Sequence, residues 1–367
     1  MIEKICIIIG TRPEVVKMSP VVRACEGREA DWFMIHTGQH YSYNMDRVFF
    51  EQLELPDAKY NLDVGSGRHG EQTGRMLTRI EDVLIKEEPD VVLVEGDTNT
   101  VLAGVLAASK LGIRVGHVEA GLRSYDRRMP EEINRVVADH ISDYLFAPTV
   151  QSRDILLGEG VADEKIFVTG NTVVDAVYQN LKIVNGRDET LESVCGTGLD
   201  LEPDGYFLVT AHRQENVDDA TRFAGILRGF ELVSKEFSLP VIYPIHPRAR
   251  KMMEEFRLDA EGVTFIEPLD YLAFLKLTAD ARLVLTDSGG VQEESCILKV
   301  PCVTLRDNTE RPETTEVGAN VLVGADPEKI LEGVRMMIDR TREWENPFGD
   351  GNAGKRIVRI ITNPGRS

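Results

Sequence analysis

The residues with the clearest chemical character lie in the run Leu285–Glu294, LTDSGGVQEE. An apolar strand is predicted to end at Thr286, and a helix with two early glutamates follows a pair of glycines. Unpaired N–H groups at a helix start suit phosphate oxygens, and glycine lets the main chain approach a bulky anion. A glutamate further along can accept hydrogen bonds from two ribose hydroxyls. The run therefore predicts a nucleotide site. The alternative is an ordinary helix capped by Ser288, with its glutamates favoured by the helix dipole.

Basic residues follow the first predicted strand, Ile5–Ile9. The motif Gly10–Glu14 (GTRPE) comes next, and its proline suits the first turn of a helix. Ligands of parallel α/β sheets gather at the carboxyl ends of the strands, so we expect Arg12 and Lys17 to face an anionic substrate. The alternative for Arg12 is a surface residue near a tight turn.

Acidic residues recur at the same edge of the predicted sheet. Asp97 and Glu119 each follow an apolar strand, and Glu131 and Glu132 open a helix after a proline. Carboxyl groups that converge raise one another's pKa, as general acid–base catalysis at neutral pH requires. Asp97, Thr98 and Glu132 have a plainer interpretation as helix caps and first-turn acids, whereas Glu119 is harder to explain in this way.

Two histidines in the second half of the chain also follow predicted strands. His212 directly precedes Arg213, and His246 lies two residues before Arg248. A lone histidine is more often structural than catalytic, but two in the same relative place favour a function. The segment Arg306–Glu313 follows another strand, and its arginines are candidates for pairing with phosphate.

Size and composition narrow the class of protein. The chain has 367 residues, 42% hydrophobic and 28% charged, which is typical of a globular protein large enough for two domains. Its formal net charge of −19 argues against a nucleic-acid or anionic-membrane partner. Five scattered cysteines without a Cys-x-x-Cys pair indicate reduced thiols. We find no signal sequence and no apolar run near the roughly 20 residues that span a bilayer, so we expect a cytoplasmic protein.

Short apolar runs alternate with amphipathic stretches, which predicts βαβ units and parallel sheets. The alternation breaks between Asn185 and Asp204 and then resumes. We therefore expect an α/β fold with two Rossmann-like, doubly wound parallel-sheet domains that face a central cleft. We place the first domain at 1–172 and the second at 173–344, and we expect the terminal helix within 345–367 to pack back on the first domain. The strands predicted to bear functional residues at their ends are Ile5–Ile9, Val91–Glu95, Val115–Val118, Tyr206–Thr210, Val241–Ile245, Arg282–Thr286 and Cys302–Leu305.

Apparent cofactor motifs are rejected. Gly65–Gly70 matches G-x-G-x-x-G but does not follow the first strand of a βαβ unit, so we interpret it as a loop ahead of a helix that begins near Glu71. The H-x-E of His117–Glu119 lacks the cysteine pair of a zinc deaminase, because only Cys302 follows Pro301. No other ligand spacing supports a metal site. We predict no NAD, no metal and no other cofactor.

Seven motifs in this order resemble the non-hydrolysing UDP-N-acetylglucosamine 2-epimerases and extend over nearly the whole chain. They are GTRPE (Gly10–Glu14), GDTNT (Gly96–Thr100), HVEAGLRS (His117–Ser124), PEEINR (Pro130–Arg135), AHRQEN (Ala211–Asn216), DSGGVQEE (Asp287–Glu294) and RDNTERPE (Arg306–Glu313). The resemblance implies a GT-B fold, usually in a homodimer. The activity that it implies is reversible conversion of UDP-N-acetylglucosamine to UDP-N-acetylmannosamine for surface polysaccharide synthesis, with no redox cofactor.

The resemblance also implies roles for the matching residues. The acid–base and leaving-group residues that it implies are Asp97, Glu119, Glu131 and His212. The implied contacts to the diphosphate, the sugar or the neighbouring groups are Arg12, Lys17, Arg135, Ser288, Gly289, Gly290 and Arg311. The implied ribose ligand is Glu294. To these we add His246 as a substrate-binding residue, from the histidine pattern described above.

Two regions depart from the family pattern. The histidine motif usually reads HRREN, and here Gln214 replaces the second arginine. Bacterial members bind a second substrate molecule as an activator, and Gln39 and His40 match that region. Ser42 and Glu71 stand where a glutamine and an arginine are common. Gln39 and His40 are our candidates for an allosteric site, which either persists with different contacts or is absent.

The implied chemistry explains the choice of residues. Departure of UDP leaves positive character at C1 of the sugar and acidifies the C2 hydrogen, so that a carboxylate can remove it and a 2-acetamidoglucal forms. UDP then adds back, with protonation from the other face. One alternative is a 2-epimerase of a related UDP-sugar such as a 2,3-diacetamido uronic acid. Others are a GT-B glycosyltransferase and a non-catalytic sugar-nucleotide sensor, although the retained acids argue against a sensor.

Overall fold

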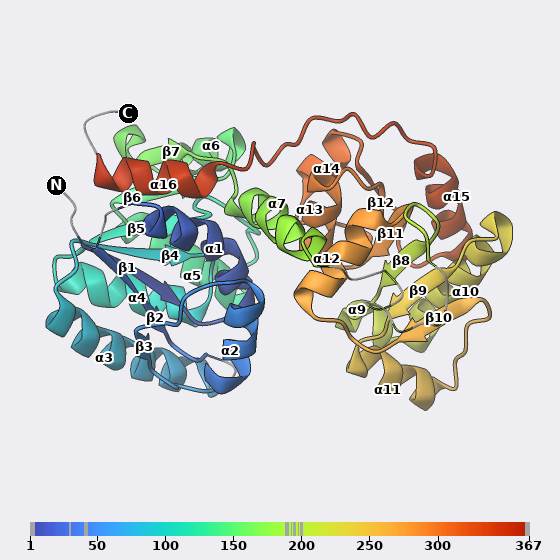
Figure 1. Cartoon of the computed structure of the whole chain (residues 1–367), viewed down its shortest axis with the longest axis horizontal. Coiled ribbons are helices and arrows are strands. Elements are labelled where there is room, and N and C mark those ends of the chain that lie inside the picture. The colour runs from blue at the N-terminus through green and yellow to red at the C-terminus, as the bar shows by residue number, and fades with distance from the viewer. Residues whose placement is uncertain are drawn as a thin grey trace. The chain divides into compact units, whose positions relative to one another are not determined.

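The structure is a computed structural model that describes residues 4–28, 31–39, 43–187, 191, 193, 196, 198 and 201–363. The chain divides into two compact units, each built on one parallel sheet (Figure 1). Unit 1 comprises Met1–Gln179 and Phe348–Ser367, and unit 2 comprises Asn180–Pro347. The predicted boundary after residue 172 falls at the start of helix α7 (Thr172–Asn185), within which the division between the units lies.

The sheet of unit 1 has seven parallel strands in the order β3-β2-β1-β4-β5-β6-β7. Its strands are β1 (Lys4–Ile9), β2 (Asp31–His36), β3 (Tyr60–Asn61), β4 (Val91–Glu95), β5 (Arg114–Val118), β6 (Tyr144–Ala147) and β7 (Ile166–Val168). Its helices, besides the first part of α7, are α1 (Arg12–Glu26), α2 (Tyr43–Gln52), α3 (His69–Glu87), α4 (Asn99–Lys110), α5 (Pro130–Ile141), α6 (Val150–Gly158), the 3₁₀ turn η1 (Asp163–Lys165) and α16 (Ala353–Thr362). The strand order reverses direction between β1 and β4, where doubly wound folds place their ligands.

The sheet of unit 2 repeats this plan with six parallel strands in the order β10-β9-β8-β11-β12-β13. Its strands are β8 (Phe207–Thr210), β9 (Val241–Pro244), β10 (Val263–Ile266), β11 (Leu283–Thr286), β12 (Cys302–Thr304) and β13 (Asn320–Leu322). Its helices, besides the second part of α7, include α9 (Gln214–Val217), α10 (Ala220–Phe237), α11 (Pro247–Phe256), α12 (Tyr271–Asp280), α13 (Gly289–Ile297), α14 (Pro312–Glu316) and α15 (Pro327–Met337). The reversal here lies between β8 and β11.

The central strands are apolar because helices cover both faces of each sheet. In β1, Cys6 and Ile8 belong to the same core as Met76 of α3 and Val101 of α4. The alternate residues of β1, such as Ile7, are also fully buried. The predicted fold class, α/β with two doubly wound parallel-sheet domains, is confirmed.

The terminal helix α16 packs against α1 within unit 1. The carboxylate of Asp175 in α7 accepts hydrogen bonds of 3.0 Å from the backbone N–H groups of Ala353 and Gly354, which have no partner within their own helix turn. A Cβ at Gly354 would lie 2.7 Å from the carbonyl of Pro20, so only glycine allows this close approach.

A few boundaries differ from the sequence predictions. Helix α3 begins at His69, two residues before the predicted start near Glu71, and β13 begins one residue earlier than the apolar pattern indicates. Helix α2 and the two-residue strand β3 were not predicted from the sequence. In the part of the chain that the structure describes, none of the helices combines the length and apolar character needed to cross a membrane.

Candidate active site

Lysine 17 of α1 pairs with two carboxyl groups at the edge of the unit 1 sheet. Its Nζ forms an ion pair with Glu119, directly after β5, and lies 3.1 Å from Oε1 of Glu95, the last residue of β4. Both glutamates are buried. Burial and the neighbouring Glu119 raise the pKa of Glu95 well above its ordinary value, while Lys17 opposes the shift. The charged form of Glu95 is therefore less favourable than that of an exposed glutamate.

The backbone around Glu119 has an uncommon conformation. Its φ angle is 67°, in the left-handed region of backbone conformation that residues other than Gly and Asn rarely adopt. Two residues later, Gly121 has a φ of 85°, and a Cβ there would lie 2.4 Å from the carbonyl oxygen of Ser152. Such strained positions persist where the surrounding structure fixes them and are frequent at functional sites. The carboxylate of Glu119 is thus held in place by its backbone as well as by Lys17.

Asp97 lies beyond β4 and forms an ion pair with Arg135 of α5. The same guanidinium lies 3.2 Å from Glu132, which also accepts hydrogen bonds of 2.9 Å from the N–H and the hydroxyl of Ser124. Hydrogen bonds from Ser124 and the charge of Arg135 lower the pKa of Glu132, although its burial opposes the shift. Glu132 is a first-turn acid of α5, as its plainer interpretation predicts, and its hydrogen bonds also fix the loop before the helix. The Asp97 side chain remains partly exposed.

A buried histidine joins the ends of β4 and β5. Nδ1 of His117 is 2.7 Å from the Asp139 carboxylate and Nε2 is 2.8 Å from the carbonyl oxygen of Gly96. A carbonyl oxygen cannot donate, and Asp139 also accepts from the N–H of Gly121 and from Arg123. Both ring nitrogens of His117 must therefore donate, which makes the side chain an imidazolium. Burial lowers the pKa of His117, but Asp139 outweighs burial and the net shift is upward.

Glu14 of α1 secures the turn after β1. Its carboxylate accepts hydrogen bonds from the N–H groups of Gly10 (2.6 Å) and Thr11 (2.7 Å) and from the Thr98 hydroxyl. Burial raises the pKa of Glu14 to about 7, against the lowering effect of these hydrogen bonds. A Cβ at Gly10 would lie 2.1 Å from the Thr100 hydroxyl, so this position allows only glycine. The turn that positions Lys17 is thus tied to the loop that bears Asp97.

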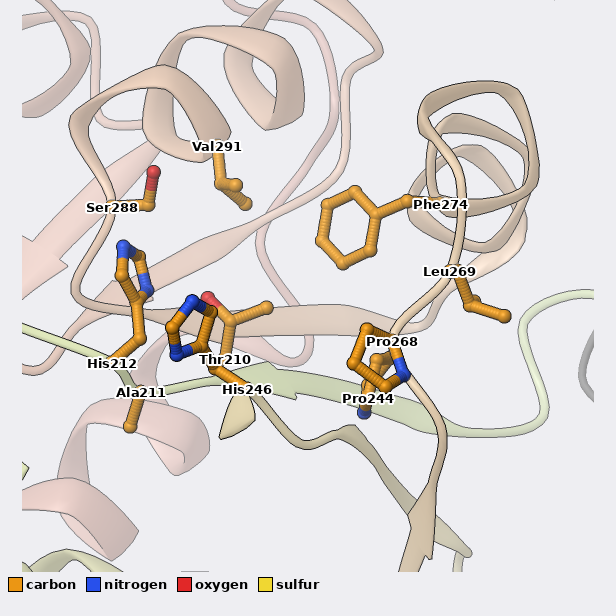
Figure 2. A pocket seen from close by; sticks show the side chains of 10 residues that line it. All are labelled: Thr210, Ala211, His212, Pro244, His246, Pro268, Leu269, Phe274, Ser288 and Val291. Atoms are coloured by element: carbon orange, nitrogen blue, oxygen red, sulfur yellow. The ribbon is translucent and has the colours of Figure 1, made fainter. Parts of the chain in front are cut away.

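In unit 2 a pocket of about 190 Å³ lies beyond the carboxyl ends of β8 and β9 (Figure 2). It is lined by Thr210, Ala211, His212, Pro244, His246, Pro268, Leu269, Phe274, Ser288 and Val291. Most of the wall is apolar, and the Phe274 ring and Val291 point toward the pocket in Figure 2. A small apolar pocket with a few convergent polar groups suits the flat ring of a nucleobase.

Two histidines line this pocket side by side. Nδ1 of His212 is 3.1 Å from the buried Asp287 carboxylate, which also accepts from the N–H groups of His212 and Arg213 at 2.9 Å. This pairing orients the ring and directs Nε2 away from Asp287. His246, whose ring centroid lies 5.8 Å from that of His212, accepts the Arg248 N–H on Nδ1, so its proton resides on Nε2. Burial and the nearby His212 lower the pKa of His246.

Helix α13 starts at Gly289 beside the pocket. Ser288 is its N-cap residue, but its hydroxyl makes no capping hydrogen bond, contrary to the alternative interpretation from the sequence. Burial raises the pKa of Glu294 to about 8, and Glu293 adds to the shift. Glu293 itself lies 2.8 Å from Nε of Arg311. Arg311, the predicted phosphate contact, thus forms an ion pair with the glutamate next to the predicted ribose ligand.

The structure brings most of the predicted residues together in groups within each unit. In unit 1 the groups are Lys17 with Glu119, and Asp97 with Arg135. In unit 2, His212, His246 and Ser288 line one pocket, with Gly289 and Gly290 in the first turn of the adjacent helix.

Other predicted residues lie apart from these groups. Arg12 is exposed, with its guanidinium 6.0 Å from the Phe49 ring centroid. Glu131 is exposed in the first turn of α5, and among the described residues no hydrogen bond or ion pair joins it to Asp97 or Glu119. Gln39 is buried and its side chain accepts hydrogen bonds from Thr100, so it supports the β1–α1 turn. His40 lies outside the described residues.

Three groups were not predicted as functional residues. Glu95 ends a predicted strand, His117 lies inside another, and Asp287 opens the nucleotide motif. A charged residue in a strand that helices cover on both faces requires a buried partner, and this signal marks Glu95 and His117 in the sequence. The partners themselves, such as Asp139, are distant in sequence and could not be identified.

Comparison of the chain with known proteins identifies its family. The sequence model described as "UDP-N-acetylglucosamine 2-epimerase" matches residues 23–362. A protein named UDP-N-acetylglucosamine 2-epimerase from Methanocaldococcus jannaschii is 57% identical over 98% of this chain and 99% of its own length. The chain belongs to the UDP-N-acetylglucosamine 2-epimerase family.

Solved structures of this family share the fold along the chain. The structure of the UDP-GlcNAc 2-epimerase from M. jannaschii covers 98% of this chain and 99% of its own, with a TM-score of 0.90 and 56% identity. A crystal structure of that epimerase in complex with UDP-GlcNAc and UDP aligns over the same shares of both chains, with a TM-score of 0.84 and 57% identity. A UDP-2,3-diacetamido-2,3-dideoxy-D-glucuronate 2-epimerase from Pseudomonas aeruginosa is 43% identical over 98% of this chain and 99% of its own.

Proposed function

We propose that this protein interconverts UDP-N-acetylglucosamine and UDP-N-acetylmannosamine by eliminating UDP and adding it back. The single observation that best supports the proposal is the buried cluster of Lys17, Glu95 and Glu119 beyond β4 and β5, in a chain that belongs to the epimerase family. This cluster holds the Glu119 carboxyl group beside a lysine in a buried site, where it can act in the removal or return of a weakly acidic proton.

Unit 2 is proposed to bind UDP. The apolar wall that contains Phe274 and Val291 receives the uracil ring, and the uncapped Ser288 hydroxyl with the first N–H groups of α13 receives phosphate oxygens. Glu294 accepts hydrogen bonds from the ribose hydroxyls. His212, oriented by Asp287, donates to the departing diphosphate, and the charge that develops on UDP is stabilised there.

Unit 1 is proposed to perform the proton chemistry at the sugar. As the C1–O bond breaks, its electron pair leaves with UDP and the C2–H becomes acidic. A carboxylate takes the proton, and the C–H electron pair forms the C1=C2 double bond of 2-acetamidoglucal. On return, an acid on the other face protonates C2 and UDP attacks C1. We assign these two roles to Glu119 and to Asp97 or Glu131, without dividing them further.

The test is product formation without any added acceptor or cofactor. Purified protein incubated with UDP-N-acetylglucosamine should yield UDP-N-acetylmannosamine until the two reach equilibrium, and the same mixture should form from either side. Small amounts of 2-acetamidoglucal and free UDP should also appear, because the intermediate escapes occasionally. Formation of N-acetylmannosamine plus UDP as the final state would instead identify a hydrolase.

A second candidate substrate is supported by the 43% identity to the Pseudomonas aeruginosa enzyme, whose name specifies a 2,3-diacetamido glucuronate. That sugar has a carboxylate at C6 and an acetamido group at C3. Parallel measurement of kcat/KM for the two UDP-sugars distinguishes them, and we expect UDP-N-acetylglucosamine to be the better substrate.

A further inference from the structure

Glu95 is a buried acid that the proposed mechanism does not use. It is the last residue of β4, and its backbone pairs with Val118, the residue that precedes Glu119. Only 2% of Glu95 is exposed. Its Oε1 lies 3.1 Å from Nζ of Lys17, which also pairs with Glu119, so the two carboxyl groups meet at one ammonium group. Two ionised carboxylates that share a buried site repel each other, and a single proton on the pair relieves that repulsion.

The charges around the pair lead to the same conclusion. Lys17 faces both glutamates, and Glu14, one turn earlier on α1, adds a third carboxyl group. From β5, the His117 imidazolium pairs with Asp139, which Arg123 also contacts, and its charge acts on Glu119 as well. Two ionised glutamates against the same lysine would still repel each other, and burial makes both charges costly. One proton on the pair removes that repulsion and one of the two buried charges.

We propose that Glu95 and Glu119 share a single proton beside Lys17, and that Glu95 is a positioning residue that keeps Glu119 in its proton-accepting form. The neutral Glu95 carboxyl donates to Glu119, and Lys17 donates to it as well, so that Glu119 is the ionised member. The positioning role of Glu95 rests on the proposed function. The shared proton does not, because it requires no substrate.

Infrared spectroscopy tests the shared proton directly, through the C=O stretch of a protonated carboxylic acid in the full-length protein at neutral pH. Glu95→Gln should remove one such band. Glu119→Gln should also remove it, because Glu95 would then face Lys17 alone and ionise. The control Glu87→Gln, which alters a glutamate paired with Lys4 and Lys59 in the same unit, should leave the band unchanged. Persistence of the band in Glu119→Gln would show that Glu95 is protonated by burial alone and would overturn the proposal.

The pH profile of kcat/KM tests the positioning role. Glutamine is neutral and donates an N–H, so the kcat/KM of Glu95→Gln at neutral pH should stay within about threefold of the wild-type value. The fall in kcat/KM at alkaline pH that ionisation of Glu95 causes should be absent from this variant. Glu95→Leu lacks the donor, and its acid limb should move up by about one pH unit, since a tenfold change in proton affinity corresponds to one unit. UDP affinity should be unchanged in both variants.

The outcomes separate this inference from the proposed function. A Glu95→Gln variant that folds but is as inactive as Glu119→Gln would mean that Glu95 acts as a carboxylate, which contradicts the proposal. A Glu95→Leu profile identical to that of the wild type would do the same. If the wild type does not epimerise its substrate while the infrared bands behave as expected, the proposed function fails and the shared proton stands. Should Glu95→Leu not fold, the Glu119→Gln spectrum remains decisive.

Discussion

The two units place different kinds of side chain on the same scaffold. Both sheets reverse their strand order after the first three strands, and in both the candidate residues follow the strands at that reversal or the strands next to it. In unit 1 they are acids and bases in buried ion pairs, such as Lys17 with Glu119. In unit 2 they are an apolar pocket with two histidines and a helix start. The fold fixes where a site lies, and the lining residues decide whether it suits proton chemistry or the binding of a nucleotide.

The comparison predicts its largest effect for unit 1. Glu119→Gln should lower turnover by about 10²- to 10⁴-fold, because a well-placed acid or base contributes that much. UDP affinity, measured by calorimetry, should stay within about twofold, since the residues proposed to bind UDP belong to unit 2. A variant with normal turnover would assign Glu119 a purely structural role. Equal losses in turnover and UDP affinity would contradict the division between the units.

The matching change in unit 2 is Phe274→Ala, which removes the aromatic wall of the pocket. Stacking of a base on an aromatic side chain contributes about 1–3 kcal/mol, so the Kd for UDP should rise by about 5- to 150-fold. Val291→Ala shortens another part of the same wall and should cause a smaller loss. Deuterium exchange at C2 under saturating substrate should remain close to normal in both. An unchanged Kd in Phe274→Ala would place the uracil ring elsewhere.

The pKa of Glu294, raised by burial to about 8, makes UDP binding pH-dependent. A carboxyl group that accepts hydrogen bonds from ribose is stabilised in its ionised form, so the pKa falls on binding and a proton is released. UDP should bind more weakly as pH decreases below about 8, by at most tenfold per pH unit. Calorimetry in two buffers of different ionisation enthalpy measures the released proton. Glu294→Gln should abolish the release; if it persists in this variant, another group is responsible.

His117→Gln sharpens the comparison of the two units, because it removes a buried charge from unit 1 and leaves the residues proposed to contact the substrate unchanged. Loss of a partner of Asp139 should lower the free energy of unfolding by about 1–3 kcal/mol, measured with urea. Because the pKa of His117 is raised on folding, its stabilising effect is complete below the unfolded value of about 6.5 and is lost as pH rises through the folded pKa. The stability difference between wild type and variant should therefore shrink at high pH. A pH-independent difference would mean that the imidazole is neutral in the folded protein.

The sequence allowed the prediction of the strands and the main helices, because apolar runs in covered parallel strands and amphipathic periods differ clearly. It also predicted that Lys17, Asp97, Glu119 and His212 would follow strands at one edge of each sheet. It did not reveal the partners of these residues. Glu95 next to Glu119, or His117 next to Asp139, depends on strand register and on helix packing between segments far apart in the chain. The sequence predicted Arg311 as a phosphate contact and did not reveal that it forms an ion pair with Glu293.

The most direct test is NMR of the purified protein with UDP-N-acetylglucosamine in D₂O. Removal of the C2 proton by a carboxylate, followed by return of a solvent-derived proton, predicts that deuterium appears at C2 of both UDP-sugars. Glu119→Gln should lose this exchange while it still binds UDP, and Phe274→Ala should retain the exchange at saturating substrate. Epimerisation of UDP-N-acetylglucosamine without deuterium at C2, or no reaction at all, would contradict the account.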